Sequence, residues 1–222
     1  MSFFRKISRA GLVLVILGVA CLWVSLGDTI ISFKQAKDFE DILDGDVAVG
    51  DHVAGQVLFL LDPFASMQTW TENSKTGSTT PKKTSSQYYV LPGGEGYMGL
   101  TVNSKNFSIA DKLVDQTYDF LSTGSMPTTE LTVDARVVVM DEELAGMFRS
   151  DMKEYYGYTD QELEEMGPIL MVEPRAFTTI RIVCGVGAAL VLAGVLVLAL
   201  HWRKVSVQER KAKEEAPGPD LD

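Results

Sequence analysis

The stretch GEGYMG, Gly94 to Gly99, has the G-x-G-x-x-G spacing that opens many dinucleotide-binding domains. In those domains a helix begins at the last glycines, and its free N–H groups and positive dipole end hold the phosphates. Here Gly99 is followed by LTVN, which is typical of a strand, and the first basic residue near it is Lys105. The spacing therefore predicts a hairpin turn at Pro92 to Gly96, and we expect no nucleotide and no other cofactor.

Histidine chemistry would have to use very few residues, because the chain contains two histidines, His52 and His201. A Ser-His-Asp triad would depend on His52, with the neighbouring Asp51 as a possible partner, and a histidine-rich metal site is excluded. Since His52 lies between glycines in VGDHVAG, a solvated turn histidine is the simpler interpretation. We expect no catalytic residue and no metal ligand.

The acidic run DFEDILDGDVAVGD has the composition of a calcium loop but not its spacing. Asp41, Asp44 and Asp46 do not fall on alternate ligand positions, and no glutamate stands at the twelfth position. A solvated acidic helix end is expected, with a loose cation site as the alternative. Residues 28–179 contain 25 acidic and 11 basic side chains, a net charge of -14, which argues against a nucleic-acid partner.

Two long apolar runs enclose this acidic segment, at residues 10–27 and 180–202. Each is long enough to cross about 30 Å of hydrocarbon as a helix, so both are predicted to be transmembrane helices in a lipid bilayer. The first run has two alternatives, a cleaved signal peptide or a lipoprotein acylated at Cys21, and an uncleaved anchor is favoured. The alternative for the second run is a buried core helix.

Lysine and arginine residues flank both runs on the side of the chain ends, in residues 1–9 and 203–222. Because positive residues are retained in the cytoplasm, both termini are predicted to be cytoplasmic and residues 28–179 extracellular, in the cell membrane. Arg181 at the outer edge of the second run opposes this orientation mildly. Residues 203–222 are expected to form a disordered tail. Both cysteines, Cys21 and Cys184, fall inside the apolar runs, so the outer segment must fold without disulfides.

The outer segment is predicted to be an α+β domain, with a mixed or antiparallel sheet covered by two or three helices. Residues 71–87 contain no large apolar side chain and are expected to form a mobile polar loop. Ser108 is expected to cap one helix and Thr159, with Glu162, another. Hydrophobic spacing predicts helices over 32–46, 108–124, 142–158 and 159–167, and strands within 47–62 and at 88–91, 97–102, 130–141 and 168–174.

Small residues recur every four positions in the second apolar run, at Gly185, Ala189 and Ala193. This spacing predicts a helix-packing face that lets another backbone approach closely, either within the chain or in another protein. Gly187 and Gly194 add small residues nearby. The first run has a narrower face at Gly18, Cys21 or Leu22, and Ser25.

The layout of the whole chain, with the hydrophobic patterns of VAGQVLFLLDPFA and LPGGEGYMGLTV, resembles uncharacterised two-pass membrane proteins of the Gram-positive bacterial type. The resemblance implies an extracytoplasmic domain and no known activity. We expect a non-enzymatic membrane protein whose external domain binds a membrane or cell-surface protein partner or supports an assembly at the cell surface. The alternatives are a sensing domain, in which residues 71–87 close over a small molecule and a partner carries the signal, and a membrane-anchored hydrolase.

Overall fold

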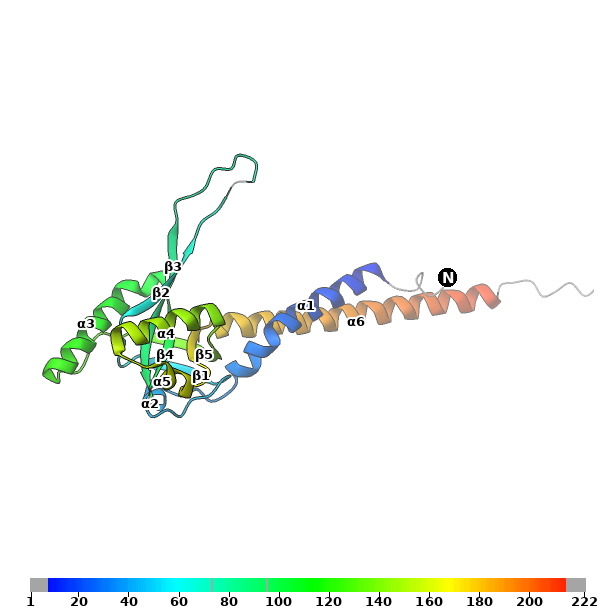
Figure 1. Ribbon diagram of the computed structural model, residues 1–222. Helices are drawn as coiled ribbons and strands as arrows, with labels where there is room; N and C mark the ends of the chain where they lie inside the picture. The colour runs from blue at the N-terminus through cyan, green and yellow to red at the C-terminus, as the bar shows by residue number, and fades with distance from the viewer. Residues whose placement is uncertain (1–7, 73, 95, 215–222) are drawn as a thin grey trace, which may run out of the picture. The chain divides into compact units, whose positions relative to one another are not determined.

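The computed structural model describes residues 8–72, 74–94 and 96–214. Its contacts divide the chain into two compact units. One unit contains the helices α1 (Arg9–Ser32) and α6 (Phe177–Glu214), and the other is the domain Phe33–Ala176. The domain is α+β, as predicted, and Figure 1 shows the elements of both units.

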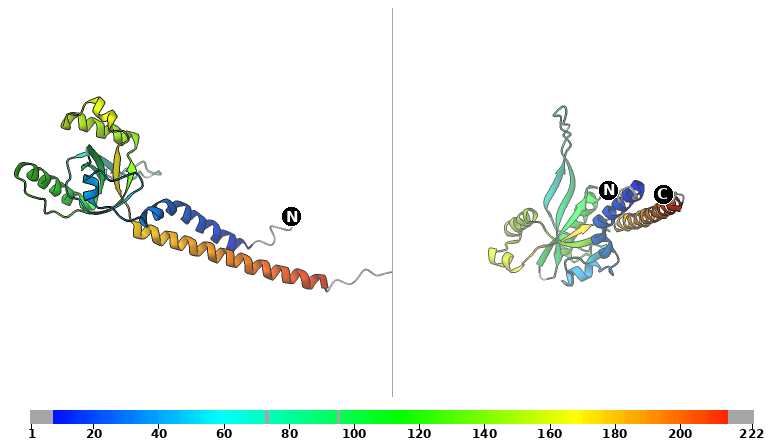
Figure 2. Two further views of the ribbon diagram at one scale, coloured as in Figure 1. Left: turned by 90° about the horizontal axis from the view of Figure 1, so that it is seen from below. Right: turned by 90° about the vertical axis from the view of Figure 1, so that its right-hand side faces the viewer.

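Helices α1 and α6 lie side by side, as both views of Figure 2 show. Both are long enough and apolar enough to cross a membrane, so the two predicted helices exist. Helix α6 continues through residues 203–214, where we expected disorder, because RKVSVQERKAKE consists largely of good helix formers. The rest of the predicted tail lies outside the described residues.

The domain is built on one six-stranded mixed sheet in the order β1-β5-β6-β4-β3-β2. All neighbouring strands pair antiparallel except β4 and β6, which pair parallel. The strands are β1 (His52–Gln56), β2 (Pro63–Thr69), β3 (Lys83–Gly93), β4 (Gly96–Asn103), β5 (Thr132–Val139) and β6 (Leu170–Pro174).

Helices cover both faces of the sheet, and alternate strand residues supply two separate cores. In β3, Tyr89 and Leu91 enter the core beneath α2 (Phe39–Leu43) and α3 (Phe107–Thr123). Val90 between them enters the core beneath α4 (Glu142–Tyr156) and α5 (Asp160–Glu165). This alternation follows from the two-residue period of a strand. Four helices therefore cover the sheet, where two or three were expected.

The helix predicted over 32–46 is much shorter in the structure. The Asp38 carboxylate accepts hydrogen bonds from the N–H groups of Glu40 and Asp41, and this N-cap begins α2. Before it the chain is extended, with Lys37 bridged to Val53 of β1. Phe33, which the predicted helix included, lies before α2 and is 74% exposed.

Strand β2 begins at Pro63, where the sequence predicted a stop. Since β2 is an edge strand, the missing N–H of its first residue removes no interior hydrogen bond. Strand β3 begins at Lys83, so residues 83–87 of the predicted polar loop belong to the sheet.

Helix α3 begins at Phe107 with no side-chain cap, and Ser108 is its second residue. The sequence predicted an apolar stripe of Ile109, Leu113, Tyr118 and Phe120 or Leu121. Leu113 is buried and Phe120 is half-buried, whereas Ile109, Tyr118 and Leu121 are exposed. By contrast, α4, α5, β5 and β6 lie where the sequence predicted them.

Candidate functional site

The closest backbone approach in the helix pair lies at glycines of α1 and α6. A Cβ atom at Gly18 would lie 2.7 Å from the carbonyl oxygen of Gly187, and one at Gly194 would lie 2.8 Å from that of Gly11. Cys21 also lies against Gly187, so the narrower face expected for the first helix makes this contact.

Helix α1 does not contact the predicted packing face of α6. Gly185, Ala189 and Ala193 are all exposed, and a Cβ at Gly185 would meet nothing within 4 Å. As a surface for a helix of another protein, this face stays a prediction. The pairing within the chain follows a seven-residue spacing instead of the predicted four-residue spacing: Gly11, Gly18, Ser25 and Ser32 in α1, and Gly187 and Gly194 in α6.

Arg181 links the two helices near the domain end of each. Its Nε donates to the Ser32 hydroxyl at 3.0 Å, and its Nη2 donates to the Ser32 carbonyl. The arginine that opposed the predicted orientation therefore has a specific partner in the structure.

The start of the G-x-G-x-x-G stretch joins β3 to β4 in an antiparallel hairpin, as predicted, and Gly96 and Gly99 lie in β4. Gly94 has φ +57°, and its N–H donates to the carbonyls of Ile42 and Leu43 at 3.1 and 3.0 Å. Strand β4 continues past Gly99 to Asn103, so no helix begins at these glycines. Their absent side chains instead admit the backbone of the α2 turn, where Gly45 lies against Gly94.

A broad groove of about 960 Å³ lies between this turn and α5. Aromatic and sulfur-containing side chains line part of it, with the Tyr97 and Tyr158 ring centroids 6.1 Å apart and Met166 beside Gly96. Glu162 and Glu165 add negative charge. The groove therefore suits an amphipathic ligand or segment better than a phosphate.

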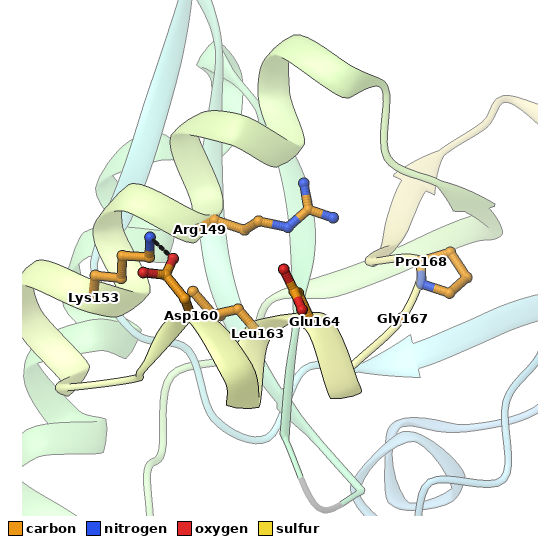
Figure 3. A pocket seen from close by; sticks show the side chains of 7 residues that line it. All are labelled: Arg149, Lys153, Asp160, Leu163, Glu164, Gly167 and Pro168. Carbon is orange, nitrogen blue, oxygen red and sulfur yellow. Dashed lines mark hydrogen bonds and ion pairs between the residues drawn. The ribbon is translucent and has the colours of Figure 1, made fainter.

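A second groove of about 560 Å³ lies between α4 and α5 (Figure 3). Lys153 forms an ion pair with Asp160, and Arg149 and Glu164 project into the space beside it. Only Leu163, which anchors α5 to the core, is apolar and fully buried here. This groove is solvated and is lined by both positively and negatively charged side chains.

Tyrosine and aspartate side chains form a third cluster. The Tyr118 hydroxyl donates to Asp62 at 2.5 Å, and burial, followed by this bond, raises the pKa of Tyr118 to about 12. Burial and then the charges of Asp62 and Glu154 raise the pKa of Asp151. The tyrosine keeps its proton at neutral pH, so it acts as a hydrogen-bond donor in a structural network.

His52 is the first residue of β1 and is buried, so the expected solvated turn histidine is wrong. Its Nε2 lies 2.7 Å from the Asp134 carboxylate and its Nδ1 lies 3.3 Å from the Lys34 carbonyl. Because both ring nitrogens have protein partners, neither is free to take a proton from a substrate.

The acidic run near α2 supplies caps and ion pairs. Asp38 and Asp41 form a capping box, and Lys37 pairs with Asp46 and Asp51. Burial opposes ionisation of Asp51, but bonds from the Ala48 N–H and from Lys37 outweigh it and lower the pKa of Asp51. Within the described ranges, no group of three or more histidine, cysteine or acidic residues is placed to hold a metal.

The polar segment between β2 and β3 forms an arm that extends beyond the sheet (Figure 1). Backbone and hydroxyl bonds between Thr71 and Thr80 continue the hairpin. At its base Lys82 Nζ lies 5.2 Å from the centre of the Trp70 ring, a cation–π contact.

Beside this arm, β2 and α4 enclose a small groove of about 200 Å³. Met67, Tyr88, Leu144 and Met147 supply apolar surface, and Asp141 and Glu143 supply negative charge, with Ala65 and Ser66 completing the lining. This groove was not predicted from the sequence, because β2 was not predicted.

A family model described as a domain of unknown function, DUF8577, matches residues 1–200. Neither curated proteins nor solved structures give a match.

Proposed function

This chain belongs to the DUF8577 family, and we propose that it is a non-enzymatic two-pass membrane protein whose external domain binds a protein partner or supports a cell-surface assembly. The observation that carries the proposal is an acidic domain, with several open grooves and an arm, inserted between two apolar helices.

The orientation rests on charge. Positive residues at both chain ends favour cytoplasmic termini, with residues 10–27 and 180–202 as the spans and residues 28–179 outside the cell. The bond to Ser32 gives Arg181, the arginine that opposes this orientation, a partner within the chain.

The surfaces support binding. The groove beside Tyr97 and the groove beside Met147 combine exposed apolar side chains with acidic ones, a composition suited to protein recognition. His52, on which a hydrolase with a Ser-His-Asp triad would depend, is bonded through both ring nitrogens, which counts against that form of the hydrolase alternative.

Topology is tested first. Trypsin added to intact cells is expected to cleave at Lys82 or Lys83 of the arm, and a variant with Lys75, Lys82 and Lys83 changed to Gln should resist that cleavage. A reporter fused after Asp222 should stay inaccessible from outside. Protection of the arm together with an outward-facing reporter would contradict the orientation.

Partner binding is tested by chemical cross-linking of the full chain in native membranes. The proposal expects products heavier than the monomer, and their loss when the grooves carry charge reversals. Recovery of the monomer alone, under conditions that cross-link a known membrane complex, would contradict it.

A small-molecule-sensing domain is the second candidate, favoured by the 960 Å³ groove, which lies in the size range of ligand sites. None of its described lining residues comes from residues 71–87, so a lid formed by that segment is not part of this candidate. A thermal-shift screen should find a stabilising ligand whose effect is lost in Tyr97→Ala. A screen without any stabilising compound would count against sensing.

A further inference from the structure

The base of the arm presents an exposed aromatic and basic pair. Trp70 is 54% exposed, although Lys82 lies over one face of its ring. Within the described residues, Lys82 and the neighbouring Lys83 form no ion pair. Tryptophan is the side chain most often found at the energetic centre of protein interfaces, because it buries a large rigid area.

The groove between β2 and α4 has the complementary chemistry. Met67 and Met147 are 49% and 46% exposed, and with Leu144 they offer an apolar floor. Asp141 and Glu143 lie at its edge. Its volume of about 200 Å³ is below the usual range for small-molecule sites and suits one large side chain.

Charge separates the arm from the rest of the domain. Residues 70–83 contain three lysines and one glutamate, a net charge of +2, whereas residues 28–179 together carry -14. The remainder is therefore -16, the difference between -14 and +2. A basic arm on an acidic body is complementary to the body of another copy.

We propose that the external domain binds a second copy of this chain by seating the Trp70–Lys82 pair of one copy in the groove between β2 and α4 of the other. This rests on the proposed partner-binding function and names the partner. The Trp70 ring lies on the methionines and Leu144, and the Lys82 ammonium reaches Glu143.

The arrangement allows the contact to be made twice. Met67 of the groove and Trp70 of the arm are three residues apart in the chain. A two-fold axis near the edge strand β2 therefore places the Trp70–Lys82 pair of each copy next to the groove of the other copy. Two copies held in one membrane also meet at a high effective concentration.

The test uses the full chain in native membranes, expressed as two differently tagged copies with Cys21 and Cys184 changed to Ser. One copy carries Thr71→Cys beside the arm tryptophan, and the other carries Ser66→Cys in the groove. A short bismaleimide is expected to join the two tags. Leu121→Cys on α3, which covers the opposite sheet face, replaces Ser66→Cys as the control and should give little product.

Two further variants test the chemistry of the contact. Trp70→Ala in both copies should reduce the mixed-tag product about tenfold or more, while Trp70→Phe retains most of it. Lys82→Glu should weaken it, and Glu143→Lys in the other copy should restore it. Lys112→Glu on α3 makes the same charge change and should have no effect. Equal melting temperatures of the variants exclude misfolding.

The outcomes separate the two proposals. Equal product at Leu121 and Ser66, or no effect of Trp70→Ala, overturns the second-copy contact. Cross-linking of Ser66→Cys to a different protein also overturns the second-copy contact, but it does not contradict the proposed function. Recovery of the monomer alone with every reagent overturns both.

Discussion

Substitution of Gly18 by alanine tests the close contact between α1 and α6. The added Cβ would lie 2.7 Å from the Gly187 carbonyl oxygen and 2.8 Å from the Val191 amide nitrogen. Both are backbone atoms, so neither can rotate away. Gly27→Ala in the same helix is the matched control, because a Cβ there meets nothing within 4 Å.

The expected effect is the difference between the two variants. Both replace a helical glycine by alanine, which favours the helix by about 1 kcal/mol, and this gain cancels in the comparison. Overpacking at Gly18 costs about 1–3 kcal/mol, since the helices must separate by several tenths of an ångström. Gly18→Ala should therefore melt roughly 2–12 °C below Gly27→Ala.

The assay is thermal unfolding of the full chain in detergent or nanodiscs, together with the maleimide reactivity of Cys21 in a Cys184→Ser background. Cys21 lies against Gly187, so its reaction should accelerate about fivefold or more in Gly18→Ala. Gly185→Ala, on the exposed face of α6, should behave like Gly27→Ala. Equal melting and equal reactivity in all three variants would refute the glycine contact.

Three further predictions concern single residues. Asp151→Asn should raise the melting temperature at pH 7 and leave it unchanged at pH 3. Burial and then the charge of Asp62 raise the pKa of Asp151 in the folded protein. The stability that this group contributes is therefore present below its unfolded pKa and is lost as the pH rises through its folded pKa. The measurement is the melting temperature of the wild type and of Asp151→Asn between pH 3 and pH 7. An equal difference between the two proteins at both pH values would contradict the prediction. Gly94→Ala should lower the free energy of unfolding by about 1–2 kcal/mol, because alanine is strained at φ +57°; denaturant titration checks this, and wild-type stability would contradict it. Arg181→Gln should lower the melting temperature, because it removes the charged bonds to Ser32, and Ser32→Ala should add little to that loss; additive losses would contradict a direct bond.

Local sequence signals predicted the elements whose ends are fixed by nearby residues. Thr159 and Glu162 form the expected capping box at α5, and Gly157 ends α4 in a left-handed conformation. The hairpin turn at Gly94 followed from glycines between two β-rich stretches. At the two helix ends the decisive interactions lie within a few residues of one another, and at Gly94 the left-handed backbone conformation is a local property, so the sequence alone contains these signals.

Features that depend on distant residues could not be predicted in the same way. β2 is stabilised by its pairing with β3. Pro63 predicts the end of a strand unless the strand is known to lie at a sheet edge. The groove beside Met147 exists only because α4 lies next to that strand. The face of α6 that contacts α1 depends on a seven-residue period shared by two helices whose contacting glycines, Gly18 and Gly187, are 169 positions apart in the chain. Each helix alone offered several equally small faces.

The order in which the ribosome makes the strands bears on how the domain matures. β6, the last strand synthesised, lies in the middle of the sheet between β5 and β4. Until residues 170–174 emerge, β1 and β5 form one ladder, β2, β3 and β4 form another, and each has an uncovered inner edge. Such uncovered strand edges favour aggregation. The insertion of β6 between the two ladders also includes the parallel pairing of β4 with β6, and parallel pairing is slow to form. Nascent chains truncated before Ile169 should therefore depend on chaperones and be degraded rapidly, whereas chains that extend into α6 escape both.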